Sequence, residues 1–230
     1  MNMSILSTIL LTAIQTGAEQ AGEVSLSFID LALKGGWIMI PLFLLSVVAI
    51  YIFAERYFAI RKASETDANF MNRIREYIHE DKIDSALALC QSKSTPVARM
   101  IEKGIQRIGR PLSDVNTAIE NVGNLEISKL EASLPFLATI SGGAPMIGFL
   151  GTVLGMIRAF YDMSMAGNNI DVGLLSNGIY TAMVTTVAGL IVGVFAYFGY
   201  NFLVARVEKV VYELEAKTSE FMDLLNEPVA

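Results

Sequence analysis

Three long stretches without a charged side chain constrain this chain more than any other feature of its sequence. They contain no Asp, Glu, Lys, Arg or His, and they cover Gly35–Ala54 (20 residues), Ala132–Ile157 (26) and Val172–Ala205 (34). A helix needs about 20 mostly apolar residues to cross a bilayer core, whereas runs of about 10–14 are typical of buried helices in soluble proteins. A chain of 230 residues cannot wrap three such helices in polar layers. The sequence therefore predicts an all-α integral membrane protein with three transmembrane helices.

Composition excludes several classes of protein. Charged residues make up 17% of the chain, against about 25% in a soluble domain, and the high hydrophobic content excludes intrinsic disorder. A net charge of −6 argues against a nucleic-acid partner, which needs a basic surface. One cysteine and one histidine cannot make a disulfide scaffold or a multi-ligand Cys/His metal site. We expect no catalytic residues, no metal and no cofactor.

The distribution of Lys and Arg predicts the orientation in the membrane. Fifteen of the 17 basic residues lie between the first and second stretches or after the third. Because cytoplasmic loops carry the excess of Lys and Arg, the N-terminus is expected in the periplasm and the C-terminus in the cytoplasm of a bacterial inner membrane. Trp37, Glu55 and Arg56 stand at the ends of the first stretch, where residues anchor a helix at the lipid interface.

These observations divide the chain into seven segments. They are a periplasmic arm 1–35 with an amphipathic helix at Val24–Leu33, transmembrane helix 36–56, a cytoplasmic helical region 57–131, transmembrane helix 132–160, a periplasmic link 161–171, transmembrane helix 172–204 and a cytoplasmic C-terminal helix 205–230. Within the helical region, Pro96 is suited to the first turn of a helix. We expect one helix to run from Leu112 to Tyr161, roughly 75 Å, and another from Val172 to Asn226, roughly 80 Å. The second and third membrane helices would thus extend into a cytoplasmic helical bundle.

Small and hydroxyl-bearing residues recur at helical spacing inside the second and third stretches. The second stretch places six small residues on one helical face, and the third has a similar face that includes Thr185, with Thr181 and Thr186 beside it. One interpretation is close helix packing, to which Gly151, Gly189 and Gly193 contribute. The other is a pore wall whose hydroxyls bind water or ions. Its candidate residues are Thr152, Thr186, Thr181, Thr185, Gly148, Gly155, Ser141 and Pro145. Both interpretations hold if neighbouring subunits pack through one side of these helices and a cavity lies on the other.

Two sequence runs carry a family resemblance. The runs Ala144–Phe160 and Gly178–Leu190 resemble the second-span and third-span signatures of the MotA/TolQ/ExbB proton-channel family. Gly35-Gly36-Trp37, Glu55-Arg56 and Tyr200-Asn201 also fit this pattern. Because MotA-type members have four spans, the three-span layout is similar to the ExbB/TolQ branch.

The resemblance implies a subunit of an inner-membrane motor. Five copies of such a subunit surround a dimer of a small single-span partner of ExbD or TolR type, whose intramembrane aspartate carries the proton. Proton flow drives rotation and energises a TonB-like protein for outer-membrane uptake. The pore threonines of the family correspond to Thr152 and Thr186.

One residue departs from the family pattern. ExbB and TolQ proteins carry a glutamate five residues before the threonine that matches Thr186, and this chain has Thr181 there. Either the partner supplies the only titrating group, or the chain is a divergent transducer coupled to H+ or Na+. Three other functions are considered beside the channel subunit. They are a structural membrane scaffold, a stator for another motor (gliding, secretion or envelope integrity) that uses H+ or Na+, and a transporter permease, which the sequence favours least.

Overall fold

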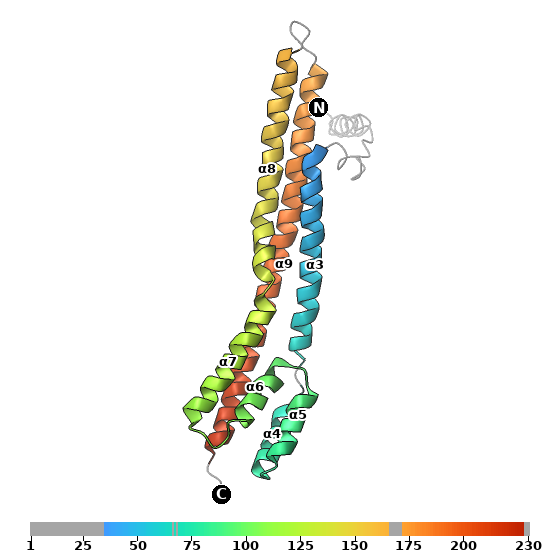
Figure 1. Cartoon of the computed structure of the whole chain (residues 1–230). Helices are drawn as coiled ribbons and strands as arrows, with labels where there is room; N and C mark the ends of the chain where they lie inside the picture. Colours follow the sequence, from blue (N-terminus) through green and yellow to red (C-terminus); the bar gives the residue numbers. More distant parts are fainter. Residues whose placement is uncertain (1–34, 66, 68, 166–171, 228–230) are drawn as a thin grey trace, which may run out of the picture.

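The computed structural model describes residues 35–65, 67, 69–165 and 172–227. The amphipathic helix expected at Val24–Leu33 and most of the periplasmic link lie outside these residues. The described elements are η1 (Gly36–Ile38), α3 (Met39–Ala63), α4 (Phe70–His79), α5 (Ile83–Ser92), α6 (Pro96–Ile105), α7 (Leu112–Glu131), α8 (Leu134–Met165) and α9 (Val172–Asn226) (Figure 1). No strand occurs in the described part of the chain.

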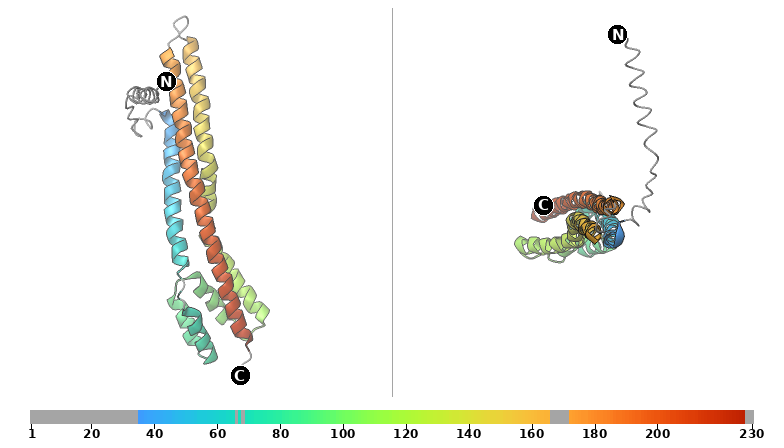
Figure 2. Two further views of the ribbon diagram at one scale, coloured as in Figure 1. Left: turned by 180° about the vertical axis from the view of Figure 1, so that it is seen from behind. Right: turned by 90° about the horizontal axis from the view of Figure 1, so that it is seen from above.

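Three long helices form the upper part of the molecule, and shorter helices surround the lower part of α9. The helices α3, α8 and α9 run side by side, while α4, α5, α6 and α7 gather at the lower end (Figures 1 and 2). Three helical stretches among the described residues, 36–63, 112–165 and 175–226, are long and apolar enough to cross a membrane. The predicted fold class, an all-α membrane protein with extended second and third helices, is confirmed.

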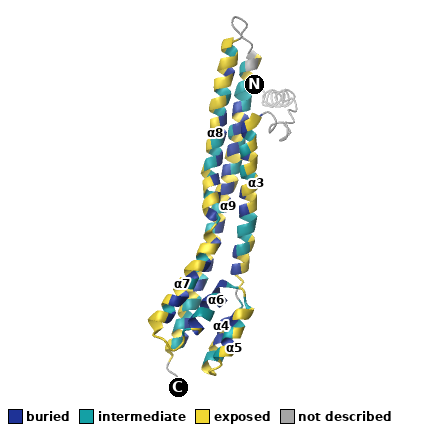
Figure 3. Cartoon of the chain, in the orientation of Figure 1, coloured by how far each residue is buried: buried dark blue, intermediate teal, exposed yellow. Residues whose placement is uncertain are grey.

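The burial pattern differs between the two parts. Large apolar side chains of α3, α8 and α9 point outward along the upper part, among them Phe43, Phe149 and Phe198, each more than 60% exposed (Figure 3). A contiguous apolar surface of this kind is covered by lipid or by other protein. In the lower part many apolar side chains point inward, and Phe221 of α9 and Ile119 of α7 are fully buried.

The expected continuous helix from Leu112 to Tyr161 is wrong at one point. Helix α7 ends at Glu131, a turn covers Ala132 and Ser133, and α8 begins at Leu134. Pro135 explains the break, because its ring clashes with the carbonyl of residue 131 and it has no N–H to donate to that carbonyl. Pro145, in contrast, lies inside α8 without ending it.

The predicted helix Val172–Asn226 is confirmed, and its lower half organises the small helices. Phe221 lies against α6, where an added Cβ on Gly104 would meet its ring 2.6 Å away. The start of α6 is built as its sequence predicts: Pro96 is its first residue, and the Thr95 side chain accepts a hydrogen bond from Ala98 N–H.

Candidate functional site

Among the described helices, α8 and α9 make the most extensive contact, and glycines make it close. A Cβ added at Gly189 would lie 2.6 Å from the carbonyl oxygen of Ala144. A Cβ added at Gly148 would lie 2.8 Å from the carbonyl oxygen of Thr185. Both neighbours are backbone atoms, which cannot rotate away as a side chain can. Only glycine therefore fits at these two crossing points, as is common where helices pack in lipid.

Small residues continue this contact along both helices. Gly151 packs on the side chain of Thr185, and Gly193 packs on the ring of Pro145. Gly155 lies opposite Ala182, whose Cβ would be 2.9 Å from an added Cβ. The structure therefore brings Gly151, Gly189 and Gly193 together with Gly148, Gly155 and Pro145, all within one chain.

The hydroxyl groups at this contact donate to backbone carbonyls. Thr186 donates to the carbonyl of Gly148 across the helix contact, at 3.1 Å. Thr185 is 1% exposed and donates to Ala182 at 2.7 Å. Thr152 and Ser141 donate within their own helix, to Phe149 at 2.6 Å and to Ala138 at 2.7 Å. Each hydroxyl keeps lone pairs that accept hydrogen bonds, so an exposed one can hold a water molecule.

Thr152 and Thr186 lie on one flank of the α8–α9 pair. An added Cβ at Gly148 would lie 3.2 Å from Cα of Thr186, and Thr152 follows Gly148 by one helical turn. Both threonines are half-buried in the isolated chain. Their separation along the helix axis is about 6 Å, because a residue rises about 1.5 Å. The flank therefore carries two hydroxyls at neighbouring levels.

Thr181 and Thr185 take different positions. Residues five apart on a helix are rotated by about 140°, so Thr181 lies on the other flank of α9 from Thr186. Thr185 is near the start of α3, since an added Cβ at Gly35 would lie 3.5 Å from its Cγ2. With almost no exposed surface, Thr185 acts as a packing residue in this chain, as does the buried Gly148.

Of the predicted anchors, Trp37 lies in η1, whereas Glu55 and Arg56 lie within the lower part of α3, which continues to Ala63. Trp37 is 69% exposed. Arg56 pairs with Glu55 and donates from Nη1 to the carbonyl of Lys129, 2.7 Å away. Because α7 stops at Glu131, the last carbonyls of α7 lack helical partners. The guanidinium of Arg56 satisfies one of them and places a positive charge at the negative end of the helix dipole.

An ion-pair cluster near the C-terminal end of α7 was not predicted from the sequence. Glu126 is 4% exposed, pairs with Arg99 of α6 and accepts from Lys129 Nζ at 2.7 Å. A buried carboxylate is stable only when it is paired in this way. The Glu126–Lys129 spacing is one helical turn and could have been noticed, whereas the partner Arg99 lies 27 residues away. The cluster ties α6 to α7.

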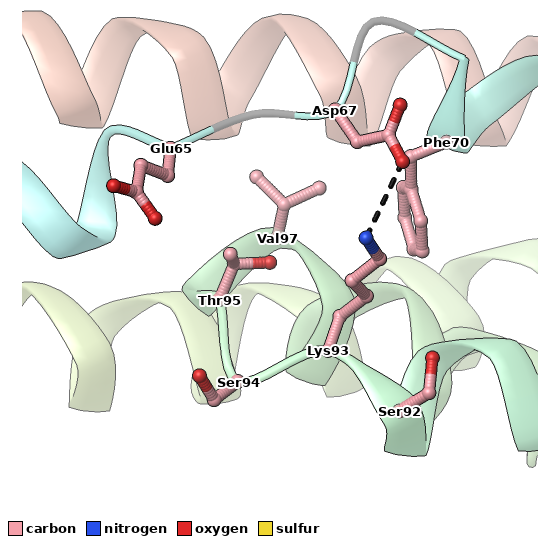
Figure 4. A pocket seen from close by; sticks show the side chains of 8 residues that line it. All are labelled: Glu65, Asp67, Phe70, Ser92, Lys93, Ser94, Thr95 and Val97. Atoms are coloured by element: carbon pink, nitrogen blue, oxygen red, sulfur yellow. Dashed lines mark ion pairs between the residues drawn. The ribbon is translucent and has the colours of Figure 1, made fainter.

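The loops below α3 enclose a polar hollow of about 380 Å³ (Figure 4). Its lining residues are Glu65, Asp67, Phe70, Ser92, Lys93, Ser94, Thr95 and Val97. Lys93 Nζ lies 3.4 Å from Asp67 Oδ2, so the two charges oppose each other across the opening. A hydrogen bond from the backbone N–H of Asn69 lowers the pKa of Asp67. The hollow lies between the segment after α3, the start of α4, the end of α5 and the start of α6.

The three apolar helices and the close small-residue contact between two of them define a multi-span α-helical membrane protein. A profile of the MotA/TolQ/ExbB proton channel family matches residues 92–216, more than half of the chain. The chain belongs to this family.

Three relatives show the extent of the similarity. An ExbB homologue of Methanothermobacter thermautotrophicus is 28% identical over 75% of this chain, which spans 62% of that relative's length. The Tol-Pal system protein TolQ of Pseudomonas aeruginosa is 27% identical over 84% of this chain and 87% of its own. The biopolymer transport protein ExbB of Aquifex aeolicus is 35% identical over 47% of this chain and 74% of its own. These relatives belong to the predicted ExbB/TolQ branch.

Proposed function

We propose that this chain is the channel-forming subunit of an inner-membrane motor driven by the proton-motive force. It works with a single-span partner of ExbD or TolR type and energises a TonB-like protein for outer-membrane transport. The family match supports the channel role, and relatives named for biopolymer transport and the Tol-Pal system support the type of complex. The chain contributes no catalytic residue and no cofactor to this work.

The flank shared by Thr152 and Thr186 is the single observation that carries this proposal. A water or ion path through lipid needs hydrogen-bonding groups at successive levels. The two hydroxyls supply them on the flank of α8 and α9 that lies away from the start of α3. Thr181 extends the set on the opposite flank of α9 and is a secondary candidate, whereas the burial of Thr185 and Gly148 argues against their facing a pore.

The distribution of basic residues supports the orientation of the subunit. With 15 of 17 Lys and Arg below the three apolar stretches, the lower helices belong in the cytoplasm and the α8–α9 connection in the periplasm. Membrane segments of 36–56, 132–160 and 172–204 fit this arrangement. In the proposal the subunit is a lipid-embedded homo-oligomer, a pentamer, with the partner in its central pore.

A second candidate is a stator for a different motor, for gliding, secretion or envelope integrity. The observation that favours it is Thr181, which replaces the intramembrane acid expected of ExbB and TolQ. A path lined by hydroxyls alone is compatible with Na+ as well as H+. Ion flux measured separately in Na+ and H+ gradients shows which ion the complex uses, and the client protein that co-purifies with the complex distinguishes the two candidates.

The test compares threonine variants in proteoliposomes that contain the chain and its single-span partner. We expect Thr152→Val or Thr186→Val to lower ion flux about tenfold or more, which corresponds to about 1.4 kcal/mol in the barrier. Complex size should stay unchanged. Thr139→Val is the matched control, because Thr139 also donates within α8, to Pro135 at 2.8 Å, but lies on the helix face turned away from α9. Thr186→Ser keeps the hydroxyl and should keep the flux.

The scaffold alternative predicts a different pattern. If the small-residue faces serve only packing, both Val variants conduct normally and only substitutions such as Gly151→Leu or Gly189→Leu matter, through loss of assembly. Normal flux in both threonine variants would remove the pore assignment.

A further inference from the structure

Two arginines without an acidic partner lie just below the apolar part of the chain, where α3 and α9 run side by side. A shallow hollow of about 130 Å³ is lined by Tyr57, Ile60, Arg61, Ser64, Leu203 and Arg206. No acid lines this hollow, and within the described residues neither arginine forms an ion pair. The chain carries 23 acids against 17 bases, so a pair of arginines that attracts no acid is notable in it. Both guanidinium groups can therefore bind an anion from outside the chain.

The height of the two arginines corresponds to the headgroup layer of a bilayer. The charge-free stretches end at Ala54 and Ala205, so Arg61 lies about 10 Å and Arg206 about 1.5 Å below them along the helix axes. Both α3 and α9 run downward from the apolar part (Figure 1), and helical side chains tilt toward the N-terminus, so both arginines reach back up toward the bilayer. The headgroup layer is about 5–7 Å deep on each side of the hydrocarbon core, which is within reach of both side chains.

A row of aromatic rings leads from the apolar surface down to this hollow. Phe53 of α3 lies 6.1 Å from Phe195 and 6.3 Å from Phe202 of α9, measured between ring centroids. Tyr57 stacks on Phe202, and the guanidinium carbon of Arg206 lies 5.2 Å from the centroid of that ring. Phe195 and Phe202 are 48% and 42% exposed. The row therefore offers apolar surface to an acyl chain directly above the two positive charges.

The hollow lies on the side of α9 away from the threonine flank. Arg206 follows Thr186 by 20 residues, which on a helix amounts to about 200° of rotation. In the proposed homo-oligomer Thr186 faces the pore. The side that carries Arg206 and the lower end of α3 then faces the surrounding lipid.

We propose that this hollow binds an anionic phospholipid of the adjacent leaflet. The guanidinium groups of Arg61 and Arg206 hold the phosphate, the Tyr57 hydroxyl is a further donor, and an acyl chain packs on the aromatic row. Arginine suits this ligand because its planar group donates two parallel hydrogen bonds to a phosphate. Free inorganic phosphate shares the charge of the headgroup but makes no use of the aromatic row. The bound lipid bridges α3 and α9 and takes no part in the ion path.

Native mass spectrometry of the full chain in detergent, titrated with phosphatidylglycerol or phosphatidylcholine, measures the lipid preference. We expect the wild type to bind phosphatidylglycerol about tenfold more tightly than phosphatidylcholine, a difference of about 1.4 kcal/mol. Arg61→Gln with Arg206→Gln should make the two affinities equal, and each single substitution should give an intermediate preference. Arg75→Gln with Arg110→Gln removes the same charge from exposed positions of the lower part and is the matched control, which should keep the preference.

Competition with inorganic phosphate identifies the source of the bound phosphate group. A large excess of inorganic phosphate should leave phosphatidylglycerol bound, because the lipid also contacts the aromatic row. If inorganic phosphate displaces the lipid at a similar concentration, the hollow takes free phosphate and the assignment to a lipid is wrong.

The remaining outcomes concern the site itself. Equal affinity of the wild type for the two lipids would contradict the proposal. A preference that survives in the Arg61 and Arg206 variant would place the bound lipid elsewhere, and an equal loss in the Arg75 and Arg110 control would reduce the effect to overall charge. Either result would overturn the proposed site. None of these results bears on the proposed function, which is measured as ion flux.

Discussion

The charged residues that matter most for folding lie just below the apolar helices. Arg56 donates to the end of α7, and Glu126 lies buried between Arg99 and Lys129. Together these contacts fasten α3 and α6 to α7 at the point where α8 begins. The cluster therefore lies at the junction between α8 and the lower helices.

At this scale the first expectation concerns Glu126. Glu126→Ala leaves Arg99 and Lys129 without their shared carboxylate and opens a space between α6 and α7. We expect a loss of about 1–3 kcal/mol in unfolding free energy, the range for hydrogen bonds to charged groups. Thermal unfolding of the purified protein, followed by circular dichroism, measures it. Glu120→Ala, on the exposed side of α7, is the control and should unfold at the wild-type temperature.

Single residues divide into those that sequence can predict and those that need coordinates. The short helix start at Thr95 and Pro96 is local and was predictable. So was the exposed position of His79 and the burial of Cys90. The contact of Arg56 with Lys129 joins residues 73 apart, and no periodicity in the chain points to it. Likewise, the spacing of Thr181 and Thr186 looks like one cluster in sequence but spans two flanks of a helix.

At the level of elements, the charge-free stretches located all three apolar helices because hydrophobicity determines membrane insertion. The α7–α8 boundary was missed, since a proline can either break a helix or be accommodated inside it. Pro135 does the first and Pro145 the second. The neighbours of each proline determine whether the helix ends there. Pro145 packs against Gly193 of α9, and this contact keeps the two helices together at that point.

The α8–α9 contact makes a sharp prediction about glycine. Gly189→Ala adds a Cβ that would lie 2.6 Å from the Ala144 carbonyl, so we expect a loss of about 1–3 kcal/mol from overpacking. Gly143 of α8 is the control, because nothing lies within 4 Å of a Cβ added there. We expect Gly143→Ala to leave the unfolding free energy unchanged or to raise it by up to about 1 kcal/mol. The melting temperatures of the two variants in one detergent decide the matter. Equal melting temperatures would mean that the helices do not meet at Gly189.

The whole molecule combines a close small-residue helix pair with apolar stretches that offer no group able to exchange a proton near neutral pH. Between Ala132 and Ile157, and between Val172 and Ala205, the chain has no acid, base or histidine. Just beyond the second stretch, Arg158 Nε and Asp162 Oδ2 lie 4.0 Å apart near the end of α8, so these two charges balance each other. A proton crossing this region needs a carrier that the chain does not supply, because hydroxyl groups orient water but do not take up a proton near neutral pH.

This absence predicts that the chain alone does not conduct protons. Proteoliposomes that contain only this chain should show the leak of empty vesicles when a proton gradient is imposed and a pH-sensitive dye is trapped inside. Addition of the single-span partner should raise the flux, and Asp→Asn in the partner's span should return it to the leak.

The variant Thr181→Glu tests directly whether the chain needs an intramembrane acid of its own. If the path needs a carboxylate on α9, the complex with this variant conducts protons faster than the wild-type complex. If the partner's carboxylate suffices, the two rates are equal. Proton conduction by the chain without its partner would contradict the assignment of the titrating group to the partner, because the protons would then cross without the partner's carboxylate.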